Sequence, residues 1–139
     1  PGEQVLDLAS GSGEPALTLA KAVGARGHVI ATDLSHAMLA IVGECVRARG
    51  LTNLSCRQAD AGALTFPNES FDLVTSRLGV MQAFPSGEAL REAWRVLKVG
   101  GRIALLVWDP AAWQAMRSIV TNGTNFPAPK PDHGFGFIA

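Results

Sequence analysis

Three aspartates in the first half of the chain have the type and spacing to bind a ligand. Asp7 lies in a short apolar run, Asp33 ends a second run, and Asp60 follows a third. Carboxylates accept hydrogen bonds from hydroxyl, amide and ammonium groups. Any one of them is explained equally well as a carboxylate that caps a turn. Three in succession predict an acidic rim at one edge of a sheet.

A loop of small residues lies beside the first aspartate. It reads Ala9-Ser10-Gly11-Ser12-Gly13, and Pro15 then opens a segment with helical spacing. Backbone N–H groups at a helix start point toward a ligand, and the peptide dipoles there favour negative charge. The loop therefore predicts a binding site for a ligand with an anionic part.

Two ligands fit a glycine loop that is followed by an acid on the second strand. One is a dinucleotide, because Gly11 to Ala16 satisfies G-x-G-x-x-A and Asp33 lies about 20 residues further on. The other is S-adenosylmethionine, whose ribose hydroxyls a carboxylate holds in the same way.

Charge favours the second ligand. Glu14, in the first turn of the predicted helix, would repel a diphosphate, and Asp7 suits a ligand with an ammonium and a sulfonium. Asp60 offers an acceptor to an adenine amino group. An NAD(P)-binding oxidoreductase domain stays as the alternative.

The elements that position these residues follow from hydrophobic periodicity. Helices are predicted at about 14–23, 36–48 and 87–97, with one more at about 111–120. Strands are predicted at about 4–8, 28–33, 54–58, 71–76 and 102–108. Alternating strands and helices with right-handed crossovers predict a doubly wound, parallel α/β sheet. The apolar run of the last strand suits a sheet that is covered on both faces, and residues 77–85 stay ambiguous.

Each helix carries an expected cap and an expected buried face. Ser35 and Ser86 are predicted N-caps, and Gly50 and Gly100-Gly101 are predicted to end their helices. The buried positions of the first helix are Ala16, Leu17, Ala20 and Val23, and those of the second are Met38, Leu39, Ile41, Val42, Cys45 and Val46. Those of the third are Leu90, Ala93, Trp94 and Leu97.

Length and charge limit the alternatives. The 139 residues predict one domain, which we place at residues 1–121, with 122–139 as a loop or partly disordered tail. The formal net charge is zero and there is no basic run, which speaks against a nucleic-acid partner. No apolar run reaches membrane-spanning length, and no leader precedes the first strand. Cys45 and Cys56 lack C-x-x-C spacing, which predicts buried free thiols in a reducing compartment, the cytoplasm.

Four segments together resemble a known family. In order they read VLDLASGSG, ATDLS, RQADAGALTFPNESFDLV and LREAWRVLKVGGRIALLVW. They resemble the successive motifs of class I S-adenosylmethionine-dependent methyltransferases, in the branch of ubiquinone/menaquinone-biosynthesis and related small-molecule enzymes. Ala9 stands where that family has the first glycine of G-x-G-x-G, and Val99 replaces the proline of L-x-P-G-G. The resemblance implies a Rossmann-like sheet with strand order 3-2-1-4-5.

The resemblance also implies a site for S-adenosylmethionine. Asp7 and the loop backbone, with Ala9, Ser10, Gly11 and Gly13, would hold the methionine part. Asp33 would accept from both ribose hydroxyls, with Leu34 and Met38 against the adenine. Asp60 and the Ala61 N–H would bind the adenine edge. The methyl-donor end would be lined by Ser76, Arg77 and Leu78, and weaker candidates on the acceptor side, equally well explained as core residues, are Met81, Gln82 and Trp108.

The implied reaction is direct displacement at the sulfonium methyl by a small-molecule acceptor, which needs position and exclusion of water more than a nucleophile. No catalytic base and no metal site are predicted, because His28, His36 and His133 have no motif around them. A non-catalytic binding module with this fold is a further alternative.

Family members are usually longer, with helices before the first strand and an antiparallel strand pair after the fifth. Since the chain opens with Pro1-Gly2 and lacks both parts, we expect a core portion of such a protein. The strand at 102–108 would then be an apolar sheet edge. We expect it to be covered by the tail, by helix 111–120 or by a second copy of the chain in a homodimer.

Overall fold

Five parallel strands form the centre of the structure, which is a computed structural model that describes residues 1–82 and 86–109. The strands are β1 (Gln4–Asp7), β2 (His28–Asp33), β3 (Leu54–Gln58), β4 (Phe71–Arg77) and β5 (Leu97–Leu106). The helices are α1 (Ala16–Val23), α2 (His36–Ala48) and α3 (Ser86–Val96), with a 3₁₀ turn η1 (Val80–Gln82).

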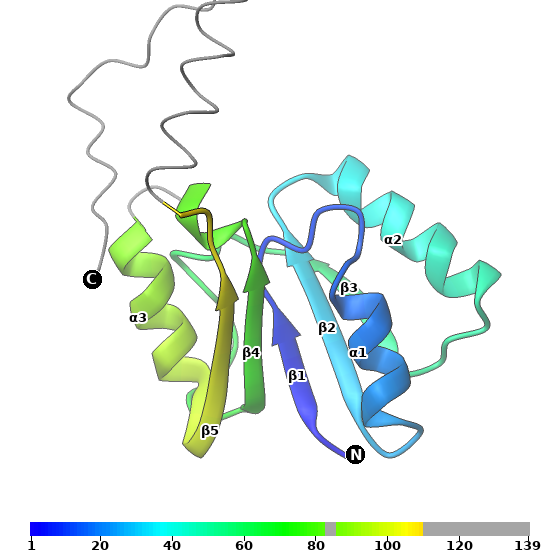
Figure 1. Ribbon diagram of the computed structural model, residues 1–139, viewed down its shortest axis with the longest axis horizontal. Coiled ribbons are helices and arrows are strands. Elements are labelled where there is room, and N and C mark those ends of the chain that lie inside the picture. Colours follow the sequence, from blue (N-terminus) through cyan, green and yellow to red (C-terminus); the bar gives the residue numbers. More distant parts are fainter. Residues whose placement is uncertain (83–85, 110–139) are drawn as a thin grey trace, which may run out of the picture. The chain divides into compact units, whose positions relative to one another are not determined.

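The sheet has the order β3-β2-β1-β4-β5, and every neighbouring pair is parallel. Figure 1 shows that all five strands end at the same edge of the sheet. The predicted fold class and strand order are confirmed. β1 lies in the middle, and its last residue, Asp7, pairs with Ala31 of β2 and Thr75 of β4.

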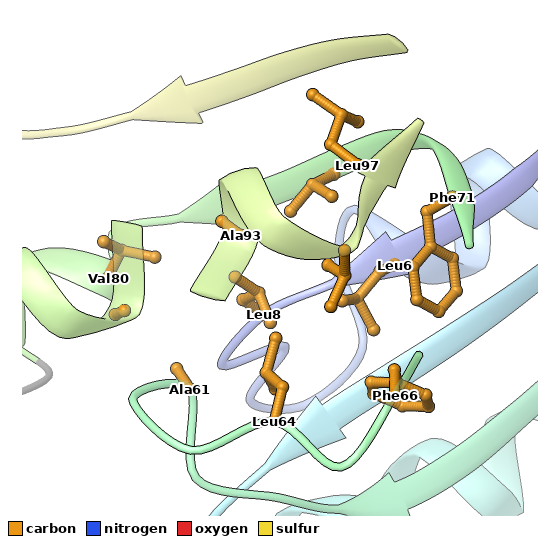
Figure 2. Packing of buried hydrophobic residues seen from close by; sticks show 12 residues of the cluster. Leu6, Leu8, Ala61, Leu64, Phe66, Phe71, Val80, Ala93 and Leu97 are labelled. Atoms are coloured by element: carbon orange, nitrogen blue, oxygen red, sulfur yellow. The ribbon is translucent and has the colours of Figure 1, made fainter. Parts of the chain in front are cut away.

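The two faces of the sheet carry separate hydrophobic clusters, because successive residues of a strand point to opposite faces. Val5 packs with α1, α2 and residues of β2, in a cluster that includes Leu17, Val29 and Val42. Leu6 and Leu8 pack on the other face. Figure 2 shows how side chains from β1, the β3–β4 loop and α3 meet in that second cluster.

Two predicted helix faces need correction. In α2 only Leu39 and Val42 are buried, whereas Met38 and Ile41 are 42% and 44% exposed. In α3 the buried stripe is Ala89, Ala93 and Val96, with i, i+4, i+7 spacing, which turns the neighbouring Trp94 outward. Trp94 is 73% exposed, so its predicted burial is wrong.

The junction of α3 and β5 also differs from the prediction. The helix begins at Ser86 and ends at Val96, and Leu97 is already the first residue of β5. Ser86 is therefore the first helical residue and not the predicted cap. Gly100 has φ 78° within an irregular stretch of β5, where pairing with β4 shifts between Phe71 and Leu73. The glycine pair therefore lies within the strand, where its pairing with β4 is irregular, and does not end the helix.

β5 pairs with β4 on one side, and no strand of the described ranges pairs with its other side. Ile103, Leu105 and Leu106 are 39%, 39% and 56% exposed, so the prediction that both faces of this strand are covered is wrong for the residues described. Cys45 is half-buried and Cys56 exposed, so these free thiols are less buried than predicted.

Residues Pro1–Leu106 form one compact unit, and Val107–Ala139 are assigned to a second. The helix predicted at 111–120, the tail predicted at 122–139 and His133 lie outside the described residues. Over the described ranges, no helix is long and apolar enough to cross a membrane.

Candidate functional site

A cleft of about 500 Å³ opens at the carboxyl ends of the strands. This is where ligands bind in open α/β sheets. It is lined by Ala9, Gly11, Asp33, Leu34, Ser35, Met38, Ala59, Asp60, Ala61, Arg77, Leu78 and Gly79. The cleft thus joins the glycine loop after β1, the end of β2, the turn after β3 and the end of β4.

Most of the predicted site residues line this cleft. They are Ala9, Gly11, Asp33, Leu34, Met38, Asp60, Ala61, Arg77 and Leu78. Four more, namely Asp7, Ser10, Gly13 and Ser76, are buried and are not among the residues that line the cleft. Met81 is not among the lining residues, and Trp108 belongs to the second unit. The side chain of Gln82 lies outside the described part of the chain.

Three lining residues were not predicted as part of the site. Ser35 was predicted only as a helix cap, a role it also has, because its hydroxyl accepts from the Met38 N–H at 3.3 Å. Gly79 fell in the ambiguous segment after β4, and Ala59 gave no signal beyond its place before Asp60. Ser35 and Ala59 are close in sequence to the strand-end acids Asp33 and Asp60. Those acids were therefore the signal that could have identified both residues as part of the site.

Asp33 connects the end of β2 to the glycine loop. Its Oδ2 accepts from the Gly11 N–H at 2.9 Å, and its Oδ1 accepts from the Ser35 N–H at 2.8 Å. A carboxylate has about four lone-pair sites, so both oxygens can still accept from a ligand. Asp33 therefore shapes the cleft even without a ligand.

Asp60 forms a tight turn after β3. Its Oδ1 accepts from the Gly62 N–H at 2.8 Å, and its carbonyl oxygen accepts from the Ala63 N–H. The turn explanation of this aspartate therefore holds, and the exposed carboxylate also borders the cleft. The two roles are compatible, because the turn leaves Oδ2 available.

The backbone on both sides of the cleft adopts left-handed conformations at residues that are not glycine. Ala9 has φ 52° and Leu78 has φ 62°. Such strained residues are uncommon and gather at functional sites. The value at Ala9 also explains the glycine of the family motif, since glycine adopts this conformation without a Cβ penalty.

Buried hydroxyl groups hold the end of β1 in place, where the strand pairing stops and the loop turns away. Thr32 of β2 donates to the Asp7 carbonyl oxygen at 2.9 Å, and Ser76 of β4 donates to the Leu8 carbonyl oxygen at 2.9 Å. The Ser76 hydroxyl also accepts from the Val80 N–H at 3.1 Å. Ser76 is thus a positioning residue that ties together β1, β4 and η1.

Asp7 is a carboxyl with no exposed surface. Its Oδ1 accepts from the Thr75 hydroxyl at 2.7 Å, whereas Oδ2 has no hydrogen-bond partner in the described ranges. Burial raises the pKa of Asp7 from 3.8 to about 7, opposed by the Thr75 hydroxyl and the nearby Ala16 amide. Asp7 does not line the cleft, so any effect it has on a ligand is electrostatic.

Glu14 does not lie in the first turn of α1, which begins at Ala16. Its Oε2 accepts from the Thr18 hydroxyl at 2.7 Å, and its Oε1 lies 3.4 Å from Arg49 Nη1. The Thr18 hydrogen bond is the main reason that the pKa of Glu14 is lowered. Since Arg49 balances this charge, Glu14 disfavours a diphosphate less than the sequence suggested.

The histidines of the described ranges lie apart from this chemistry. His28 begins β2, at the opposite end of the strand from Asp33, and its Nε2 lies 2.8 Å from the Ser55 hydroxyl oxygen. His36 is an exposed first residue of α2. The described residues include no group of His, Cys, Asp and Glu side chains placed to hold a metal ion.

Comparison with known proteins places the chain in a family. The model of the "ubiE/COQ5 methyltransferase family" matches residues 1–119. A relative from Xanthomonas oryzae pv. oryzae, named ubiquinone/menaquinone biosynthesis C-methyltransferase UbiE, is 43% identical over 107 residues, which are 76% of this chain and 42% of the relative.

Solved structures share the fold. The [4+2]-cyclase SpnF is 30% identical with a TM-score of 0.70, over 75% of this chain and 38% of that one. A SAM-dependent methyltransferase from Aquifex aeolicus has a TM-score of 0.74 at 24% identity, over 88% of this chain and 72% of that one. This second likeness is evidence for the fold alone. The chain spans about half the length of the relatives it matches, from 42% to 48% for those compared.

Proposed function

Because the chain belongs to the ubiE/COQ5 methyltransferase family, we propose that it binds S-adenosylmethionine in the strand-end cleft and transfers its methyl group to a small molecule. The observation that carries this proposal is the convergence of the glycine loop, Asp33 and Asp60 on one cleft.

The donors and acceptors of the cleft fit this cofactor. Asp33 would accept from the ribose hydroxyls, and Leu34 and Met38, 64% and 42% exposed beside it, would cover the adenine. Asp60 would accept from the adenine amino group. The Asp7 Oδ2, which has no hydrogen-bond partner among the described residues, suits a ligand with a positive charge nearby.

The cofactor supplies an electrophilic methyl group on a sulfonium, and the residues of the chain supply position and shape. Gly11 and Ala9 present the loop backbone at one side of the cleft, while Arg77, Leu78 and Gly79 form the other side at the end of β4. Displacement at the methyl requires the acceptor to approach in line, so holding both reactants in place provides most of the rate.

For the acceptor we propose a small molecule of quinone biosynthesis that is methylated at carbon. The names of the relatives support this, since they are described as ubiquinone/menaquinone biosynthesis C-methyltransferases. Methyl transfer from radiolabelled S-adenosylmethionine to a hydroquinone would test it, with the corresponding monomethyl ether as a control acceptor.

Isothermal titration calorimetry with four ligands tests the cofactor assignment. We expect S-adenosylmethionine and S-adenosylhomocysteine to bind, and NAD and NADP not to bind. Binding of NAD without either S-adenosyl ligand would instead support an oxidoreductase domain.

A second candidate function is binding of the cofactor without methyl transfer. The likeness to SpnF supports this candidate, because SpnF has the same fold and is described as a [4+2]-cyclase and not as a methyltransferase. Binding of S-adenosylmethionine with no transfer to any acceptor of the full-length protein would support this candidate.

We also propose that the edge of β5 opposite β4, which no strand of the described ranges pairs with, forms a homodimer contact. An edge strand with exposed apolar side chains is a template for pairing, and Ile103 is 39% exposed there. Light scattering on Ile103→Lys should show loss of the dimer, while Val99→Lys, at a 90% exposed position in the irregular stretch, should not. A wild-type monomer would contradict the proposal.

The free thiols support a location in the cytoplasm, where cysteines stay reduced. Cell fractionation of the tagged full-length protein would test this.

A further inference from the structure

Arg77 carries the positive charge of the strand-end cleft. It is the last residue of β4, it is exposed, and no other Lys, Arg or His is among the described residues that line the cleft. Arg49, Arg95 and Arg102 each pair with a carboxylate, whereas the Arg77 guanidinium has no ion pair or hydrogen bond in the part of the chain that the structure describes. Its five N–H donors are therefore available to a ligand.

The backbone fixes the position from which the Arg77 side chain extends. Arg77 pairs with Leu106 of β5, and the N–H of the next residue donates to the Leu106 carbonyl oxygen at 2.8 Å. On the side of β1, the Ser76 hydroxyl donates to the Leu8 carbonyl oxygen at 2.9 Å. The end of β4 is thus tied to both neighbouring strands, and the guanidinium extends from a fixed base.

Opposite charges lie on the two sides of the cleft. Asp33 and Asp60 line it at the ends of β2 and β3, Arg77 lines it at the end of β4, and β1 lies between the two sides. Because neighbouring strands are about 4.8 Å apart, the backbones of Asp33 and Arg77 lie about 10 Å apart across the cleft. A ligand that spans the cleft meets carboxylates on one side and a cation on the other.

Methylation of a ring carbon gives such a cation a role. With the adenosine of the cofactor on the side of Asp33 and Asp60, the acceptor takes the side of β4. A ring carbon of a hydroquinone is a good nucleophile when the neighbouring hydroxyl is ionised, because the oxyanion donates electron density to that carbon. A phenolic hydroxyl has a pKa of about 10 in water, and a cation beside its oxygen favours the ionised form.

We propose that the Arg77 guanidinium binds the oxyanion of a phenolic or enolic acceptor and so selects acceptors with an ionisable hydroxyl beside the methylated carbon. The hydroxyl gives its proton to water, and the oxyanion stays paired with Arg77. The ring carbon then bonds to the methyl carbon while the carbon–sulfur bond breaks with its electron pair on sulfur. The ring carbon loses its proton to water, and the oxygen regains one on release. This inference rests on the proposed function and names its class of acceptor.

Binding of 4-nitrophenol gives a readout that needs no methyl transfer, because the ionised form of this phenol absorbs visible light. In the full-length protein saturated with S-adenosylhomocysteine, the pKa of bound 4-nitrophenol should be lower than in water by about 1–3. Arg77→Gln should abolish this lowering. Arg77→Lys should keep part of it, because the charge remains and the planar fork of donors is lost.

Arg26→Gln is the matched control. Arg26 is also an exposed arginine, but it lies just before β2, whose other end carries Asp33 at the cleft. The substitution removes the same charge from the opposite edge of the sheet. Arg26→Gln should therefore lower the pKa of bound 4-nitrophenol as the wild-type protein does.

Methyl transfer to 1,4-dihydroxynaphthalene gives a second readout. The dependence of kcat on pH reports ionisations in the bound complex. The pH at which kcat is half-maximal should be higher in Arg77→Gln than in wild type by about 1–3, and the two rates should converge as pH rises. The KM for S-adenosylmethionine should be the same in both proteins. A purely structural role of Arg77 would lower kcat equally at every pH.

Two results would overturn the role of Arg77. One is a bound 4-nitrophenol whose pKa is not lowered by the wild-type protein, or is lowered equally by Arg77→Gln. The other is weaker binding of S-adenosylhomocysteine by Arg77→Gln with unchanged binding of 5′-methylthioadenosine, which would assign Arg77 to the carboxylate of the cofactor. Both results leave the proposed function intact, whereas a wild-type protein that binds neither S-adenosyl ligand contradicts that function itself.

Discussion

Gly79 packs so closely against Ala9 that a Cβ added at Gly79 would overlap the Ala9 Cβ and lie 2.9 Å from the Ala9 carbonyl oxygen. Both residues line the cleft, one after β4 and the other in the glycine loop. The position of the loop therefore depends on the absence of a side chain at Gly79.

Gly79→Ala should destabilise the fold by about 1–3 kcal/mol, the usual cost of overpacking, and should weaken binding of S-adenosylhomocysteine. Ala9→Gly combined with it should restore part of the loss, because one of the overlapping methyl groups is then gone. Urea unfolding of both single variants and the double variant measures this coupling.

Gly87→Ala is a suitable control, since nothing lies within 4 Å of a Cβ added at that helical position. It should leave stability unchanged or raise it by about 0.5–1 kcal/mol. Strict additivity of Gly79→Ala and Ala9→Gly would contradict the packing relationship.

Asp33→Ala should lower the affinity for S-adenosylhomocysteine about tenfold or more, because two ribose hydroxyls lose their acceptor, at about 1–3 kcal/mol. The loss should be similar for 5′-methylthioadenosine, which keeps the ribose and lacks the amino-acid part. Calorimetry on both ligands gives the comparison, and Glu69→Gln, at an exposed position away from the cleft, is the control. An unchanged Kd in the folded Asp33→Ala variant would show that the ribose lies elsewhere.

Ser76→Ala should destabilise the protein by about 1–3 kcal/mol, because it leaves the Leu8 carbonyl oxygen and the Val80 N–H without a partner. Since Ser76 is buried and is not among the residues that line the cleft, we expect the Kd for S-adenosylhomocysteine to change less than about threefold at temperatures where the variant is folded, which is within about 1 kcal/mol. Ser12→Ala, in the exposed part of the loop, should change neither quantity. A large loss of affinity without loss of stability would instead identify Ser76 as a ligand contact.

Asp7 should make the ligand-free protein less stable as pH rises. Its pKa is raised from 3.8 to about 7, so its contribution to stability is complete below the lower value and is lost as pH rises through the higher one. Relative to Asp7→Asn, the wild-type chain should lose about 4 kcal/mol of unfolding free energy between about pH 4 and pH 8. Chemical denaturation over this range measures the difference, and parallel curves for the two proteins would contradict it.

The order of the helices and strands could be predicted from the sequence, because hydrophobic periodicity and helix caps depend on residues that are close together in the chain. Periodicity and caps gave β2 and α2 with the bounds that the structure has, at His28–Asp33 and His36–Ala48. The junction of α3 and β5 was predicted less well. There, pairing with β4 begins at Leu97 and outweighs the preference of Gly100-Gly101 for ending a helix.

The acidic and small residues of the cleft could be predicted from the sequence, because the carboxyl ends of parallel strands meet at one edge of the sheet. What could not be predicted was which groups would face the cleft and which would lie beneath it. Asp7 and Ser76 occupy strand-end positions like those of the lining residues, but neighbouring strands on both sides enclose them. Whether a strand-end residue faces the cleft or is enclosed depends on the central position of β1. This strand pairs with β4, and the bonded residues Asp7 and Thr75 are 68 positions apart in the chain.

The pairing of β1 with β4 also has a consequence for how the protein folds. The units β1-α1-β2 and β2-α2-β3 join strands that follow one another in sequence, whereas the Asp7–Thr75 bond closes a separation of 68 residues. Closing so long a loop costs chain entropy before the strand contacts compensate for it. We therefore expect the first three strands to associate early and β4 to dock late, so that the ligand cleft forms in the last step of folding.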